Sequence, residues 1–145
     1  MQPAKQIQDE LYVSHSQLFT YSNCSLKYKF QYVEQRKQER ISSALPFGKA
    51  IHAALEIYYC DIQANGTPSR LERMLAAFCA SLLDQINNSN VPVIYKKEAR
   101  DLEALLAMGE GLIRTFYKET DITGYEIVGV EVPLTAPLYS EDREE

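Results

Sequence analysis

The sequence contains no tryptophan, only three cysteines and no long apolar run, and these absences exclude several classes of protein. Without about 18 consecutive apolar residues, no transmembrane helix is expected. The first ten residues are too polar for a signal peptide. Cys24, Cys60 and Cys79 are odd in number and far apart, which favours reduced thiols in the cytoplasm over a disulfide framework.

Positive charge is also scarce, since the formal net charge is −5 at pH 7. Nucleic-acid binders are usually basic, so the balance argues mildly against a freestanding protein of that class. The hydrophobic share of 46% is ordinary for a globular chain and argues against wholesale disorder. A chain of 145 residues predicts one domain with a real core.

Apolar residues recur at helical spacing in four segments of the chain. We predict helices over residues 14–32 with a break near Cys24, and over about 48–62, 69–86 and 98–118. Ser14 or Ser16 is expected to cap the first helix and Ser69 the third. Gly109 and Gly111 weaken the fourth helix by about 1 kcal/mol each relative to alanine, and we expect close packing there.

The periodicity changes in "YEIVGVEVPLTAPLY", where β-branched residues alternate with others. This alternation predicts a strand over residues 125–134. A lone strand cannot satisfy its own backbone groups, so we expect the chain to be the front part of a larger α/β domain. The exposed edge, residues 127–132, is expected to pair with a second copy and give a homodimer.

The stretch "LPFGKAIHAALEIYY" places His52 and Glu56 four residues apart in an apolar helix. Residues at this spacing are neighbours on one helix face. An imidazole beside a carboxylate is consistent with a metal ligand and its partner, a buried hydrogen-bonded pair or a surface ion pair. Spacing alone leaves these three interpretations open.

The motifs of "SHSQLFTYSNCSLKYKFQYV" and "LPFGKAIHAALEIYY" resemble the N-terminal portion of RecB-like nucleases of the PD-(D/E)XK superfamily. They are Ser-x-Ser-x-Leu, Tyr-x-x-Cys followed by an aromatic residue, and Gly-x-x-x-His at Gly48 and His52. "IVGVEVPLTAPL" resembles the family's first core strand. One departure is Ser25, where the family commonly has proline.

The resemblance implies the N-terminal part of a restriction-endonuclease-like α/β fold, mostly α-helical here with one or two C-terminal β-strands. Residues 1–145 would form part of a single nuclease domain. The family's second-strand aspartate and its Asp/Glu-x-Lys motif do not occur in these residues. We therefore expect this chain alone not to cut DNA.

The function that the resemblance implies is metal-dependent hydrolysis of DNA, by an exonuclease or endonuclease of repair, recombination or defence. His52 would bind Mg²⁺ or Mn²⁺, which neutralises the phosphate and activates water. Glu56 would accept the second N–H of that imidazole. Glu131 would face the site as a further acidic group, or equally be a solvated strand residue.

A locally basic region, together with two serines, predicts contacts with DNA phosphates. The candidate residues are Ser14, Ser16, Lys27, Lys29, Arg36, Lys37, Arg40 and Lys49. In some relatives the cysteine that matches Cys24 binds an iron–sulfur cluster with three C-terminal cysteines. Those partners are missing here, so a cluster at Cys24 would require a longer parent chain, and a small core residue is the favoured interpretation.

The sequence leaves two classes of function open. The first is a RecB-like nuclease that acts on DNA, with a helicase or repair-complex partner. The second is a non-catalytic helical interaction module or a degenerate nuclease relative. A Gly-x-x-Asp strand followed by Asp/Glu-x-Lys beyond Glu145 would favour the first.

Overall fold

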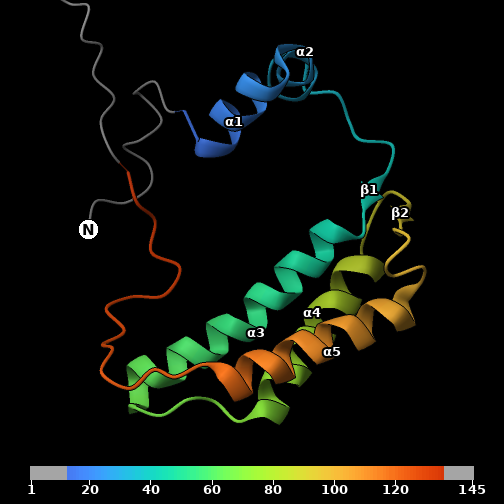
Figure 1. Cartoon of the computed structure of the whole chain (residues 1–145). Coiled ribbons are helices and arrows are strands. Elements are labelled where there is room, and N and C mark those ends of the chain that lie inside the picture. The colour runs from blue at the N-terminus through green and yellow to red at the C-terminus, as the bar shows by residue number, and fades with distance from the viewer. Residues whose placement is uncertain (1–12, 136–145) are drawn as a thin grey trace, which may run out of the picture. The chain divides into compact units, whose positions relative to one another are not determined.

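A computed structural model describes residues 13–135 of the chain (Figure 1). The chain divides into two units, Met1–Glu39 and Arg40–Glu145. None of the described helices is long and apolar enough to cross a lipid bilayer.

The described part of the first unit contains α1 (His15–Asn23), α2 (Ser25–Tyr28) and the π-helix η2 (Lys29–Val33). Ser14 caps α1, because its Oγ accepts from the Gln17 N–H at 3.2 Å. The Gln17 Oε1 in turn accepts from the Ser14 N–H at 2.7 Å, which completes a capping box. At Cys24 the backbone is extended, with φ −162° and ψ 102°, so the predicted break between helices is confirmed.

The chain folds back on itself after η2. The Glu34 N–H donates to the Lys29 carbonyl at 2.8 Å, and Gln35 follows in the left-handed region at φ 50°. The Arg36 N–H then donates to the Phe30 carbonyl at 2.9 Å. No residue between 13 and 39 is fully buried, so this unit has no closed core of its own in the described structure.

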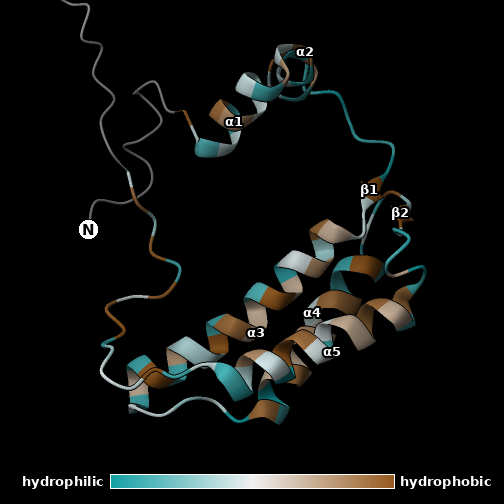
Figure 2. Ribbon diagram, in the orientation of Figure 1, coloured by the Kyte–Doolittle hydropathy of each residue, from teal (hydrophilic) through white to brown (hydrophobic). Residues whose placement is uncertain are grey.

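Three helices form the core of the second unit, and apolar residues lie along them where they run side by side (Figure 2). They are α3 (Ala44–Asn65), α4 (Leu71–Asn87) and α5 (Leu102–Glu119). Each helix buries residues at spacings of four, which form one face of a helix. These are Pro46, Ala50, Ala54, Tyr58 and Ile62 of α3, Met74, Phe78 and Leu82 of α4, and Leu105, Gly109 and Ile113 of α5.

A two-stranded parallel sheet lies beside the start of α3. It joins β1 (Ile41–Ser42) to β2 (Val93–Ile94). The Ile41 N–H donates to the Pro92 carbonyl at 3.1 Å, and the Ser43 N–H donates to the Ile94 carbonyl at 2.9 Å. Strands of two residues are too short to show alternation, so the sequence predicted no strand at these positions.

The strand predicted over residues 125–134 is not formed in the described structure, and its assignment was wrong. The segment after α5 is irregular, and its side chains are largely exposed, with Val128 and Leu134 both at 89%. A ladder needs a neighbouring strand to pair with, and no described segment pairs with this one. The edge that the expected homodimer required is therefore absent from the described residues.

The starts of α4 and α5 also differ from prediction. Arg70, and not Ser69, is the N-cap of α4. Ser69 is only 3% exposed, and its Oγ has no hydrogen-bond partner among the described residues. The last helix begins at Leu102 because the Asp101 Oδ1 accepts from the Ala104 N–H at 2.8 Å, as an N-cap does.

Replacing Gly109 by alanine is expected to destabilise the protein, whereas the same change at Gly111 is expected to stabilise it. A Cβ at Gly109 would overlap the ring of Phe78, whereas nothing lies within 4 Å of one at Gly111. Overpacking costs about 1–3 kcal/mol, and removing an exposed helical glycine gains about 1 kcal/mol. Urea unfolding of the two variants measures both effects, and equal shifts for the pair would contradict the packing at Gly109.

Candidate functional site

His52 lies on the solvent side of α3. Ala50 and Ala54, two residues to either side, are fully buried, while the His52 side chain is 72% exposed. The helical repeat places these positions on different faces. His52 is therefore not a core residue, and the interpretation of His52 and Glu56 as a buried pair is excluded.

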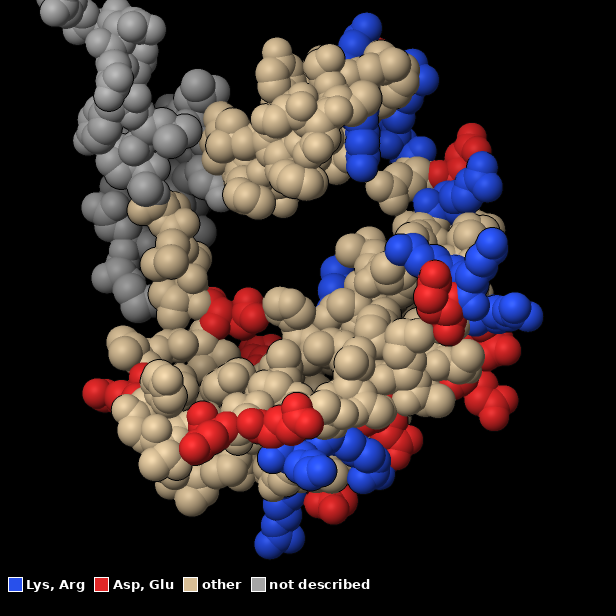
Figure 3. All heavy atoms as spheres, viewed as in Figure 1, with Lys and Arg blue, Asp and Glu red and all other residues tan. Residues whose placement is uncertain are grey.

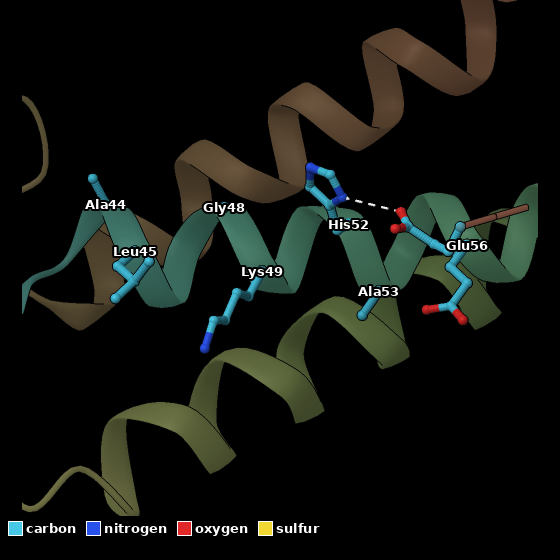
Figure 4. A pocket seen from close by; sticks show the side chains of 8 residues that line it. Ala44, Leu45, Gly48, Lys49, His52, Ala53 and Glu56 are labelled. Atoms are coloured by element: carbon cyan, nitrogen blue, oxygen red, sulfur yellow. Dashed lines mark hydrogen bonds and ion pairs between the residues drawn. The ribbon is translucent and has the colours of Figure 1, made fainter. Parts of the chain in front are cut away.

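Glu131 reaches His52 from the segment that follows α5. The His52 Nδ1 lies 3.3 Å from the Glu131 Oε1, although 79 residues separate them in sequence (Figure 4). The Gln63 Nε2 donates to the Val128 carbonyl at 3.1 Å, and Ile127 packs against the core. These two contacts hold the segment against α3 and so bring Glu131 to the histidine.

The backbone of Glu131 adopts φ 50°, in the left-handed region. This conformation costs a residue with a Cβ about 1–3 kcal/mol, and such residues cluster at functional sites. The strained turn lies at the residue whose carboxylate meets His52. The Glu131 side chain is 60% exposed, so this geometry is consistent with a site residue and with a solvated surface residue.

An open hollow of about 610 Å³ surrounds this pair. Lys49, one turn before His52, and Glu56, one turn after it, line the hollow together with Gly48 and Glu131 (Figure 4). No hydrogen bond in the described structure joins Glu56 to His52, whose partner is Glu131. The hollow thus combines an imidazole, two carboxylates and one ammonium group.

The pair has the donor types and the separation of two neighbouring ligands of a divalent metal ion. Oxygen or nitrogen donors about 2.0–2.1 Å from an octahedral ion stand about 3 Å apart, close to the 3.3 Å observed. Imidazole with carboxylate suits Mn²⁺ and tolerates Mg²⁺. Among residues 13–135, however, no group of three histidine, cysteine or acidic side chains forms a complete site.

The predicted phosphate contacts divide between the two units. The Ser14 Oγ is engaged in the α1 cap, and Ser16 is exposed. Lys29 and Arg36 both pair with Glu34, at 3.5 Å and 2.6 Å. Of the remaining candidates, Lys27 and Lys37 line a separate hollow in the first unit, Arg40 begins the second unit, and Lys49 lines the hollow around His52.

The three cysteines are free thiols. Cys24 is exposed, and its Sγ accepts from the Lys27 N–H at 3.4 Å as the N-cap of α2. The expectation that Cys24 is a small core residue is therefore wrong in the described unit. No cysteine cluster that could hold iron and sulfur occurs within the described part of the chain.

Sequence reasoning missed two features of this structure. It proposed both His52 and Glu131 for the site but did not foresee their direct contact. It also missed the stacking of Arg36 on Phe30, where the guanidinium carbon lies 4.0 Å from the ring centroid. The signal for this stacking is the backbone reversal at Gln35, which the sequence alone does not show.

Comparison with known proteins gives one family. The model of the PD-(D/E)XK nuclease superfamily matches residues 12–139, which include both His52 and Glu131. No curated protein and no solved structure shows significant similarity to the chain.

Proposed function

Because the chain belongs to the PD-(D/E)XK nuclease superfamily, we propose that it forms part of a RecB-like nuclease. Such an enzyme would hydrolyse phosphodiester bonds of DNA with the help of a divalent metal ion. His52 and Glu131 are two of the metal ligands in this proposal. The supporting observation is their contact at 3.3 Å across 79 residues of sequence. DNA repair, recombination or defence is the proposed setting.

Three of the groups in the hollow have a task in this proposal. His52 supplies a neutral nitrogen donor, and its other N–H remains available to a neighbouring acceptor. Glu131 supplies a negative oxygen donor, and Lys49 is placed to attract a phosphate of the substrate. A divalent metal, when bound, neutralises the phosphate and provides the attacking hydroxide.

Catalysis requires groups beyond these 145 residues. The sequence contains no Asp/Glu-x-Lys motif, whose acid completes the metal shell and whose lysine aligns water in the family that it resembles. One imidazole and one carboxylate bind Mg²⁺ weakly, because this ion prefers several oxygen ligands. We therefore propose that the 145 residues alone do not cleave DNA.

Manganese titration is expected to broaden the imidazole NMR signals of His52 and to leave those of His15 sharp. The chain has only these two histidines, so His15 is an internal control within the same sample. Mn²⁺ is paramagnetic and favours an imidazole beside a carboxylate. Replacing Glu131 by glutamine should weaken the broadening at His52, because the second donor loses its charge.

Equal broadening of both histidines would contradict the proposed metal site. So would broadening of His52 that Glu131→Gln leaves unchanged, since the metal would then bind without the carboxylate. Glu126→Gln is the matched control, because Glu126 lies on the same segment and does not line the hollow around His52. That variant should titrate like the wild type.

A second candidate is a non-catalytic interaction module or a degenerate nuclease relative. The observation that favours it is the absence of a third metal ligand among residues 13–135. This candidate predicts no selective effect of Mn²⁺ on His52. The manganese titration therefore distinguishes the two functions.

Location and partners form the last part of the proposal. The free state of all three cysteines supports a reducing compartment, and we place the protein in the cytoplasm. A helicase or repair complex is the proposed protein partner. Pairing of two copies through residues 127–132 stays a prediction, although the described backbone forms no strand there.

A further inference from the structure

A preorganised planar platform lies at the end of η2 in the first unit. The Arg36 guanidinium carbon lies 4.0 Å from the centroid of the Phe30 ring, within the range of a cation–π contact. The Arg36 Nε donates to the Glu34 Oε2 at 2.6 Å, which fixes the guanidinium at its edge. The Arg36 side chain is nevertheless 62% exposed, so the aromatic ring and the carboxylate leave much of it open.

The backbone around the platform departs from regular structure at two places. The π-helix η2 contains Phe30, and π-helical turns are frequent at functional sites. Gln35 is held at φ 50°, and this reversal returns Arg36 to Phe30 through the backbone hydrogen bond between them. A left-handed residue after the C-cap is a common helix ending, and here it also brings Arg36 back over Phe30.

Cationic groups surround the platform. A hollow of about 420 Å³ is lined by Lys27, Phe30, Arg36 and Lys37, and no acidic side chain lines it. Between residues 13 and 39 the chain has four lysines and arginines against two glutamates, although the whole chain is acidic. In Figure 3 the lysine and arginine side chains of this unit gather at one end of it.

We infer that this platform binds single-stranded DNA, with one base stacked on the open face of Arg36 and flanking phosphates on Lys27 and Lys37. Arginine guanidinium planes stack on unpaired bases, and positively charged grooves with stacking surfaces are typical of single-strand binding. In a duplex the bases are already stacked on each other, so the platform should select single strands. This inference rests on the proposed function and names its substrate class.

The test is fluorescence anisotropy of the whole chain with labelled oligothymidylate, a strand of abasic sites of equal length, and a duplex. Chelator is present throughout, so that binding is measured without metal. We expect oligothymidylate to bind about tenfold more tightly than the abasic strand, as one stacked base allows. The logarithm of the affinity should fall with the logarithm of salt with a slope of about −1.4, from two lysines on phosphates of a single strand.

Arg36→Lys is the critical variant, because it keeps the charge and loses the plane. It should bind both strands equally and retain the salt dependence. Arg114→Lys is the matched control, since Arg114 also pairs with a glutamate, at 2.7 Å, and is 54% exposed. Circular dichroism tests whether both variants fold. Because replacing arginine by lysine is a conservative change, the first unit should keep its structure.

Three results would overturn the inference: no binding, equal binding of abasic and base-bearing strands by the wild type, or duplex bound as tightly as single strand. A base preference that survives Arg36→Lys would also overturn it. Failure of the nuclease proposal is distinguishable, because that proposal is tested by manganese at His52. The platform is tested in chelator, at residues that the metal does not need.

Discussion

In a form of the protein that cleaves DNA, replacing His52 by alanine is expected to lower the cleavage rate by at least about 100-fold. Residues that only orient a metal ligand already cost about 10–100-fold in metal affinity or activity when they are replaced, and a direct ligand should cost at least as much. The expected loss comes from chemistry and not from unfolding. The His52 side chain is 72% exposed, and exposed substitutions usually change stability by less than about 0.5 kcal/mol. Cleavage of labelled single-stranded DNA in Mn²⁺, beside a urea unfolding curve, measures both quantities.

His15→Ala is the control for this experiment, because it removes the other imidazole from a helix of the first unit. It should keep full activity at saturating DNA. Glu131→Gln should resemble His52→Ala if the two share a metal. The assignment fails if His52→Ala melts several degrees lower and keeps full activity, since His52 would then be a structural residue.

Replacing Phe78 by alanine is expected to lower the free energy of unfolding by about 3–5 kcal/mol. Phe78 is fully buried in α4, touches the position of Gly109, and packs edge-on against Phe47 at 5.9 Å between ring centroids. Removing the ring leaves a cavity among three helices that relax only partly. Because single domains are stable by about 5–15 kcal/mol, the variant should lose a large share of its stability.

Urea unfolding followed by circular dichroism measures this loss. Phe19→Ala is the matched control, since Phe19 is 64% exposed and should change stability little. A loss below about 1 kcal/mol for Phe78→Ala would show that the three helices close around the vacated space. Such a small loss of stability would also contradict the tight packing of Phe78 against Gly109.

The helices could be predicted because each repeats its apolar residues at intervals of three and four. The starts of helices are less certain, because they depend on one cap. Ser69 has the right chemistry for a cap, yet Arg70 occupies the N-cap position and Ser69 is buried. Asp101 illustrates the opposite case, since the predicted helix began earlier than the residue that caps it.

The sheet could not be predicted for a different reason. Each strand has two residues, and their pairing joins Ile41 to Val93 across the sequence. Residues 125–134 do alternate, but alternation predicts a strand only where a partner strand completes the ladder. No described segment pairs with them, and the backbone stays irregular.

The candidate site was predicted as a set of residues but not as a geometry. His52 was selected by a motif and Glu131 by its place in an apolar segment. Their contact depends on Ile127 and Gln63, which hold the segment on α3. Such a contact between distant parts of the chain has no periodic signature, so the sequence proposed both residues for the site without predicting that they touch.

Helix α3 presents Ala50 and Ala54 to the interior and His52, between them, to solvent. Because both side chains are single methyl groups, they allow the axis of α3 to lie close to the neighbouring helices α4 and α5. A bulkier residue at either alanine would overpack the interior unless the helix moved away from its neighbours, and His52 would move with it. Substitutions at Ala50 or Ala54 can therefore displace His52 without contacting it. The position of His52 on the surface thus depends on two small side chains in the interior.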